Sequence, residues 1–218
     1  MCIRDRYGAF LGARFGDYRA AYEYGMLGIS VIDKYPDPFL KGRLHQSFGA
    51  LIAFWCRPFH SYIHHFTEAL HLNLVSGDFL YTTLTISNLL SHSFRKGNPI
   101  DSLMLLHEAH RNVVAMSGIA EAPQMFDLYR NAIQELKEGG EASSETASSV
   151  LEHLKGSAYL HHMALLLKMI SLFMKGRYRE AAGVGREMER GVATHLGSVI
   201  HITEFWFYYS LSLLSLIH

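Results

Sequence analysis

The stretch "FGDYRAAYEYG" at residues 15–25 has a near copy far along the chain, "KGRYREAAGVG" at residues 175–185. Each copy holds a Gly, then a Tyr two residues later, an Ala five later and a second Gly nine later: Gly16, Tyr18, Ala21 and Gly25, then Gly176, Tyr178, Ala181 and Gly185. Such a recurrence indicates a repeated structural unit. We expect the first Gly of each copy to form a tight turn between two helices, the Tyr ring to pack over that turn, and the small Ala to let the second helix approach the first.

Apolar residues recur at spacings of three and four along almost the whole chain, without sustained alternation of period two. This pattern predicts an all-α protein. Gly and Pro interrupt the pattern about every 20 residues, which predicts one helix in each interval. The predicted helices cover about residues 7–15, 17–35, 38–55, 59–76, 78–96, 99–117, 121–138, 157–175, 177–194 and 197–217.

Alternate interruptions lie about 40 residues apart, at Gly16, Arg57-Pro58, Gly97, Gly139 and Gly176. A fixed period of this size is typical of solenoids built from helix pairs. The expected fold is an α-α superhelix, a tetratricopeptide-like solenoid of about five helix pairs, forming a single domain over residues 7–218. Residues 138–149 are rich in Gly, Ser and Glu and predict a flexible loop, followed by a short helix near 149–155.

Composition excludes several classes of function. Lys plus Arg and Asp plus Glu number 20 each, so no net charge attracts nucleic acid or an anionic membrane. Apolar residues make up 49% of the 218, typical of a folded globular chain. No uninterrupted apolar run reaches the roughly 18 residues of a membrane span. Two cysteines, Cys2 and Cys56, are too few for a disulfide framework, and no signal peptide is evident, so we expect a cytoplasmic protein.

The first six residues, "MCIRDR" at 1–6, join no pattern further along the chain. We interpret them as non-native residues derived from a sequencing adapter, and we expect the chain to be a fragment of a longer protein. The apolar ending "SLLSLIH" agrees with this expectation, because the end of a natural solenoid normally carries a polar capping face.

Fourteen histidines raise the hypothesis of a metal site. His60, His64 and Glu68 share one helix face, and Glu68 and His71 form a Glu-x-x-His motif. A di-iron bundle needs that motif twice with two further Glu on facing helices, and here it occurs once. Pro58 separates Cys56 from these histidines. We therefore expect no metal, and a helical metal-binding enzyme stays the least favoured alternative.

Other motifs of catalysis are weak. His107-Glu108 begins like the phosphoacceptor box of histidine kinases, but no Pro follows, which favours a surface helix of mixed charge. His161-His162 lies in an apolar helix and favours packing. The chain contains no G-x-x-x-x-G-K-[ST] motif, no G-x-S-x-G elbow, and "GVGREM" from Gly183 lacks the third Gly of a dinucleotide fingerprint. We expect no catalytic residues and no cofactor in this segment.

The aromatic run "FWFYYSLSLL" starts at Phe205. In a solenoid helix, Phe205, Tyr208, Tyr209 and Leu213 would pack against neighbouring helices. The alternative is an interaction surface made by Phe205, Trp206, Tyr208 and Tyr209. If the next helix of a longer chain is missing, part of this run is an exposed apolar patch that promotes association.

A set of motifs in fixed order resembles a known family. The set is "GDYRAAYEYG" from Gly16, "FGALIAFW" from Phe48, "FTEALHLNLVSGDFLYTT" from Phe66, "KGNPIDSL" from Lys96, "LFMKGRYREAA" from Leu172 and "FWFYYSLSLLSL" from Phe205. From Tyr7 to Ile217 the chain resembles the tetratricopeptide-like helical region of very large bacterial signalling proteins. In that family a serine/threonine-kinase-like domain and an AAA-type ATPase precede the region, and GAF and histidine-kinase modules follow it.

The resemblance implies a non-catalytic regulatory segment that links an ATPase to kinase output. Its partners would be proteins, either other domains of the same chain or a peptide or helix. An alternative is a stand-alone adaptor that binds a peptide or helix in a concave groove. The side chains that would favour such a groove are scattered, at Asn73, Asn88 and Asn131.

Overall fold

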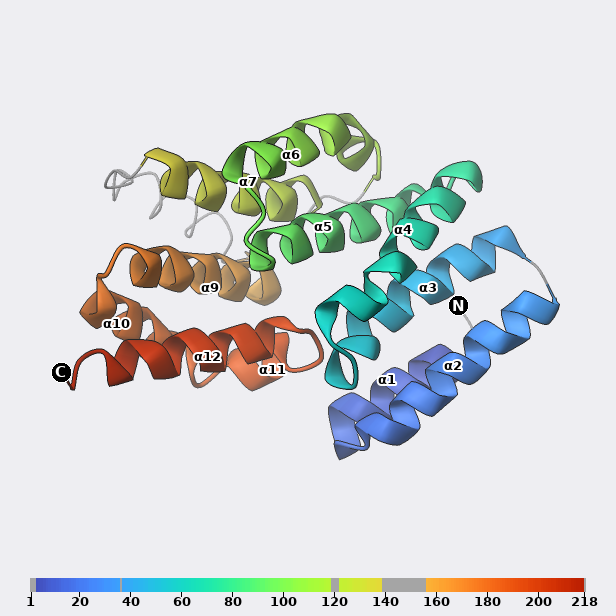
Figure 1. Ribbon diagram of the computed structural model, residues 1–218, viewed down its shortest axis with the longest axis horizontal. Helices are drawn as coiled ribbons and strands as arrows, with labels where there is room; N and C mark the ends of the chain where they lie inside the picture. Colours follow the sequence, from blue (N-terminus) through green and yellow to red (C-terminus); the bar gives the residue numbers. More distant parts are fainter. Residues whose placement is uncertain (1–2, 36, 119–121, 139–155, 218) are drawn as a thin grey trace. The chain divides into compact units, whose positions relative to one another are not determined.

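The computed structural model describes residues 3–35, 37–118, 122–138 and 156–217. The described residues form eleven α-helices and one short 3₁₀ helix, without a strand among them, which confirms the all-α prediction (Figure 1). In chain order the elements are α1 (Ile3–Phe15), α2 (Tyr18–Lys34), α3 (Pro38–Leu51), η1 (Ala53–Trp55), α4 (Phe59–Val75), α5 (Phe79–Arg95), α6 (Ile100–Ala115), α7 (Ala122–Glu138), α9 (Ala158–Met174), α10 (Tyr178–Met188), α11 (Val192–Leu196) and α12 (His201–Leu214).

Two predicted helices are interrupted. The segment predicted at 38–55 is helical only to Leu51, and η1 follows it before Pro58 starts the approach to α4. The segment predicted at 177–194 is divided into α10 and α11, and Gly191 lies between them. Glycine lowers helix propensity, and at this position a Cβ would lie 2.5 Å from His162 Nε2. The predicted loop at 138–149 and the short helix near 149–155 lie outside the described residues.

The chain divides into two compact units. Unit 1 contains α1 to α5, the second half of α6 and the first two residues of α7. Unit 2 contains the first half of α6, the rest of α7 and α9 to α12. The single domain over residues 7–218 stays a prediction, because two compact units can belong to one domain.

The turns between paired helices follow one geometry. Gly77, Gly97 and Gly176 have φ between 67° and 74°, the left-handed region that glycine adopts without steric cost. After each glycine the next N–H donates to the carbonyl five residues earlier, Asp78 to Asn73, Asn98 to Ser93 and Arg177 to Leu172. This is the Schellman motif, which satisfies the last carbonyls of a helix. Gly16 and Gly118 have the same positive φ.

Aspartates start three of the helices. Asp17, Asp37 and Asp78 each accept a hydrogen bond from the backbone N–H three residues later, at 3.0, 3.1 and 3.3 Å. A cap of this kind satisfies an N–H that has no partner within the helix. Asp78 is buried and also accepts a 2.5 Å hydrogen bond from Arg43 Nε, so it joins the start of α5 to α3.

In unit 1 the helices approach closely where small residues meet. Ala21 on α2 is buried against α1, where a Cβ on Gly8 would lie 2.9 Å from the Ala21 carbonyl oxygen. On the next pair, Gly49 of α3 faces the Phe66 ring of α4, and a Cβ on Gly49 would lie 2.9 Å from Phe66 Cζ. Phe48 and Phe66 are fully buried at the centre of this core.

In unit 2, α9 is the most buried helix and packs against α10 and α12. Its apolar residues include Leu166 and Met169, which are fully buried. The other side of α9 contacts α7, because Ser171 Oγ and Lys175 Nζ both donate hydrogen bonds to Glu135, at 2.9 and 2.8 Å. Within the described ranges, no helix combines the length and the apolar character that a membrane span needs.

Candidate functional site

Both copies of the sequence repeat form the turn of a helix pair. Gly16 connects α1 to α2 with φ of 69°, and Gly176 connects α9 to α10 with φ of 73°. The ring of Tyr178 lies 5.3 Å from that of Phe173, which precedes the turn on α9. The ring of Tyr18 stacks instead on Trp55 of η1, with the centroids 4.5 Å apart. The first copy therefore uses its tyrosine to join the turn to a later element.

The alanine of each copy is buried. Ala21 and Ala181 have 1% and 0% of their surface exposed. Neither has room for a larger side chain, because protein interiors are close-packed.

The second glycine of each copy receives an aromatic ring from a later helix. A Cβ on Gly25 would lie 2.5 Å from Cδ2 of Phe48 on α3. A Cβ on Gly185 would meet the ring of Tyr209 on α12 even more closely. In both copies, the helix after the turn therefore packs its glycine under a ring of the next long helix.

Because this contact is made in the same way twice, the residues of α3 can be aligned with those of α12. When Phe48 is matched with Tyr209, Leu44 is matched with Phe205, and both of these residues are buried. The face of α3 that packs against α2 is therefore equivalent to the face of α12 that packs against α10.

The opposite faces of α3 and α12 differ. On α3, His45, Gln46 and Gly49 are buried, and α4 covers His45 with His65 and Gly49 with Phe66. The matched residues on α12 are Trp206, Phe207 and Ser210, and all three are exposed.

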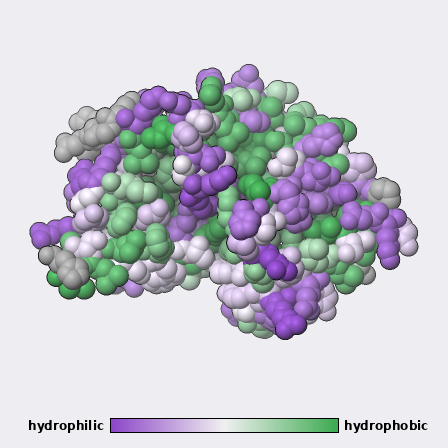
Figure 2. Space-filling model, in the orientation of Figure 1, coloured by the Kyte–Doolittle hydropathy of each residue, from purple (hydrophilic) through white to green (hydrophobic). Residues whose placement is uncertain are grey.

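We call this exposed surface the outer face of α12. It consists of Thr203, Trp206, Phe207, Ser210, Leu213 and Leu214. Trp206, Phe207 and Leu214 have 46, 58 and 56% of their surface exposed. Figure 2 shows green and pale atoms over much of the region that α12 occupies in Figure 1.

The structure separates the four aromatic residues that the sequence assigns to an interaction surface. Phe205 and Tyr209 are buried, so their rings belong to the core of unit 2, and Tyr208 is half-buried against Phe173. Trp206 is exposed. The sequence reasoning missed Phe207 and Leu214, although their spacing from Trp206 places all three on one helix face.

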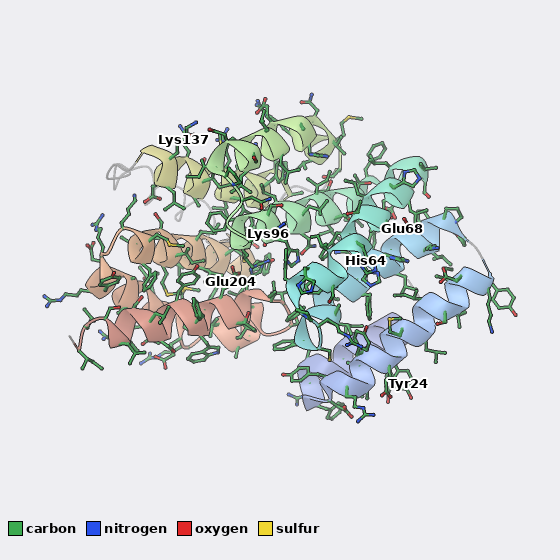
Figure 3. The ribbon with its side chains drawn as sticks, viewed as in Figure 1. Tyr24, His64, Glu68, Lys96, Lys137 and Glu204 are labelled. Carbon is green, nitrogen blue, oxygen red and sulfur yellow. The ribbon has the colours of Figure 1, made fainter. Side chains whose placement is uncertain are left out.

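The charged residue of α12 lies away from the outer face. Glu204 is half-buried, and its carboxylate lies 2.8 Å from His201 Nδ1 on the same helix (Figure 3). The outer face of α12 itself carries no ionisable side chain.

The histidines proposed as metal ligands do not converge. His60, His64 and His71 are exposed along α4, and Glu68 shares their helix (Figure 3). In the part of the chain that the structure describes, no three His, Cys, Asp or Glu residues lie close enough to hold a metal ion.

A buried histidine pair was not predicted. His45 of α3 and His65 of α4 are each 7% exposed, and their Nδ1 atoms lie 3.0 Å apart, so one ring donates a hydrogen bond and the other accepts it. Burial and then the charges of His64 and His45 lower the pKa of His65 to about 3. Burial likewise lowers the pKa of His45. The two rings are 20 positions apart in the chain, and no sequence motif joins them.

The predicted surface helix of mixed charge is confirmed for the exposed side of α6, where Glu108 pairs with Arg111, but His107 does not lie on that surface. His107 is 1% exposed, and its ring stacks on Phe126 with centroids 4.2 Å apart, because this side of α6 packs against α7. Glu108, the next residue, has an exposed side chain, so only one of the pair lies on the surface. His162 contacts His195 with ring centroids 4.4 Å apart, and its Nδ1 lies 2.8 Å from the Ala158 carbonyl oxygen. This packing agrees with the interpretation of His161-His162 as residues that pack.

Comparison of the chain with family models, with curated proteins and with solved structures gives no match.

Proposed function

We propose that this chain is a helical-repeat scaffold that acts through protein contacts. The observation that carries the proposal is the repeated contact of a helix glycine with a ring of the next long helix, Gly25 with Phe48 and Gly185 with Tyr209. Repeat proteins reuse one such contact in each unit, and they present exposed helix faces to partners. The outer face of α12 supplies a surface of this kind.

The proposed arrangement is an α-α superhelix of about five helix pairs. Its support is the series of glycine turns at Gly16, Gly97 and Gly176 together with the register shared by α3 and α12. Small-angle X-ray scattering of dilute protein tests it. A compact globule of 218 residues has a radius of gyration of roughly 17 Å. A superhelix gives a larger value, and a value near that of the globule contradicts the superhelix.

Within this proposal, the chain is a non-catalytic regulatory segment of a multidomain signalling ATPase or kinase. Its support is the ordered set of motifs from Gly16 to Phe205 that resembles such proteins. Sequencing the source DNA across both ends of the reading frame is the test. A P-loop ATPase upstream and a GAF or histidine-kinase module downstream are expected, and nearby stop codons on both sides contradict this role.

A second candidate is a stand-alone adaptor for a peptide or helix. The outer face of α12 favours it, because an apolar stripe along one helix is the surface that binds another amphipathic helix. The same sequencing separates the two candidates, since stop codons on both sides are the result that an adaptor predicts.

A further inference from the structure

The large apolar residues on the outer face of α12 are spaced symmetrically about Ser210. Trp206 and Phe207 lie four and three residues before Ser210, and Leu213 and Leu214 lie three and four residues after it. Such a stripe is complementary to itself when two copies of the helix lie antiparallel around a two-fold axis at its centre. Each aromatic side chain of one copy then lies against a leucine of the other. A two-fold interface uses the same patch on both partners in this way.

The residue at the centre of the stripe is small. Ser210 is matched with Gly49 of α3, the position that receives the Phe66 ring of α4. A small residue at a helix crossing lets the two backbones approach, so Ser210 leaves room for a helix on the outer face.

The equivalent face of α3 shows how such a face is covered. Gly42, near the start of α3, faces Asn73 near the end of α4, and Gly49, near the end of α3, faces Phe66 in the middle of α4. The covering helix therefore runs antiparallel to α3, which is the direction that the symmetric stripe of α12 also requires.

Charge and area agree with a second copy of the same helix. The outer face carries no ionisable side chain, so two copies meet without repulsion between like charges. Its apolar side chains, with Leu216 and Ile217 in the turn after α12, leave roughly 600 Å² uncovered on each copy, at about 200 Å² for a whole side chain of this size. A small specific interface buries about the same area on each partner.

We propose that the outer face of α12 binds the outer face of α12 in a second copy of this chain, with the two helices antiparallel around a two-fold axis at Ser210. The inference rests on the proposed function, because it names a second copy of this chain as the protein that the outer face of α12 contacts.

Sedimentation equilibrium of the whole chain over a range of concentrations tests the dimer. We expect a monomer–dimer equilibrium. Leu214→Glu raises the dimer dissociation constant about tenfold or more, because it places a charge against the Trp206 ring of the other copy. Leu105→Glu is the matched control, since Leu105 of α6 is 72% exposed and lies outside the stripe. The control leaves the dissociation constant unchanged.

Cysteine cross-linking tests the axis independently of stability. In a Cys2→Ser, Cys56→Ser background, Ser210→Cys forms a disulfide between two copies under mild oxidation. Thr203→Cys does not, because the two introduced cysteines of an antiparallel pair lie 14 residues apart, roughly 20 Å at 1.5 Å per residue. Ser30→Cys, an exposed serine within α2, is the control that reports random collision.

Three results overturn the proposal. The first is a monomer at every concentration up to about 100 μM, beyond the range of a specific interface of this area. The second is oligomers that keep growing with concentration, because a two-fold interface closes at the dimer. The third is cross-linking of Thr203→Cys as fast as Ser210→Cys, which requires parallel helices.

Discussion

The two repeats at the ends of the chain share a framework and differ in what covers it. In the first repeat, α1, α2 and α3 stack through Ala21 and Gly25, and α4 then covers the far face of α3. In the second, α9, α10 and α12 stack through Ala181 and Gly185, and the far face of α12 is exposed. The repeated residues therefore specify the contacts among the helices of one repeat. The surface that a repeat presents to the next helix depends on residues outside the repeated motif, such as Gly49 in α3 and Ser210 in α12.

The largest effect is expected from filling the helix crossing that both repeats share. Ala181→Leu and Ala21→Leu each destabilise the protein by about 3 kcal/mol, because three extra carbons cannot fit at a fully buried crossing. Urea denaturation measures the change. Ala115→Leu, at an exposed position on α6, is the control and stays near zero. An unchanged midpoint for either buried variant would show that the alanine does not set the helix spacing.

The contact between glycine and ring is tested by adding one methyl group. Gly25→Ala and Gly185→Ala each cost about 2 kcal/mol, because the new Cβ overlaps the ring of Phe48 or Tyr209. Gly28→Ala and Gly183→Ala are matched controls on the same helices, with ordinary or no contacts at the new Cβ. Each control gains up to about 1 kcal/mol from helix propensity. Equal effects at tested and control positions would contradict the shared register.

The positions of the turns and the faces of the helices could be predicted from the sequence, and the reason is physical. A glycine such as Gly176 marks a left-handed turn because other residues pay to adopt it, so the break is visible in the sequence. Periodicity likewise places Trp206 and Phe207 on one side of a helix. It does not show which side is covered, because Phe205 and Trp206 are both large and apolar, and burial depends on distant helices. The His45–His65 contact is equally invisible, since two separate helices bring the rings together.

The free energy of unfolding is expected to fall at acid pH, because of the buried His65 beside the first repeat. Because the pKa of His65 is about 3 in the folded protein and about 6.5 in the unfolded chain, only the unfolded chain takes up this proton as the pH falls below 6.5. Stability is therefore complete above pH 6.5 and decreases toward pH 3, by about 1 to 2 kcal/mol between pH 7 and pH 5. Urea denaturation at both pH values measures the loss.

His65→Gln removes this part of the pH dependence. His71→Gln, at an exposed histidine of the same helix, is the control and keeps it. The same slope in His65→Gln and in the unmodified protein would mean that the buried pair does not couple folding to pH.

The smallest effect concerns the start of the second helix in each repeat. Asp17→Ala costs about 1 kcal/mol, because α2 loses the cap at Ala20 N–H. At the matched position of α10, Arg177 pairs instead with Glu180 on the helix surface. Arg177→Ala therefore changes the thermal midpoint less than Asp17→Ala does. A larger change for Arg177→Ala would show that the Arg177–Glu180 ion pair stabilises its helix more than the Asp17 cap does.

The stacking of Trp55 on Tyr18 and the exposure of Trp206 have a spectroscopic consequence. The chain contains two tryptophans, one in each unit. Excited at 295 nm, Trp206 emits at long wavelength while water surrounds it and shifts to shorter wavelength when another surface excludes that water. Trp55 responds to the loss of its stacked neighbour when unit 1 unfolds. Replacement of either tryptophan by Phe leaves a single natural reporter, so folding and association can be followed separately without an attached dye.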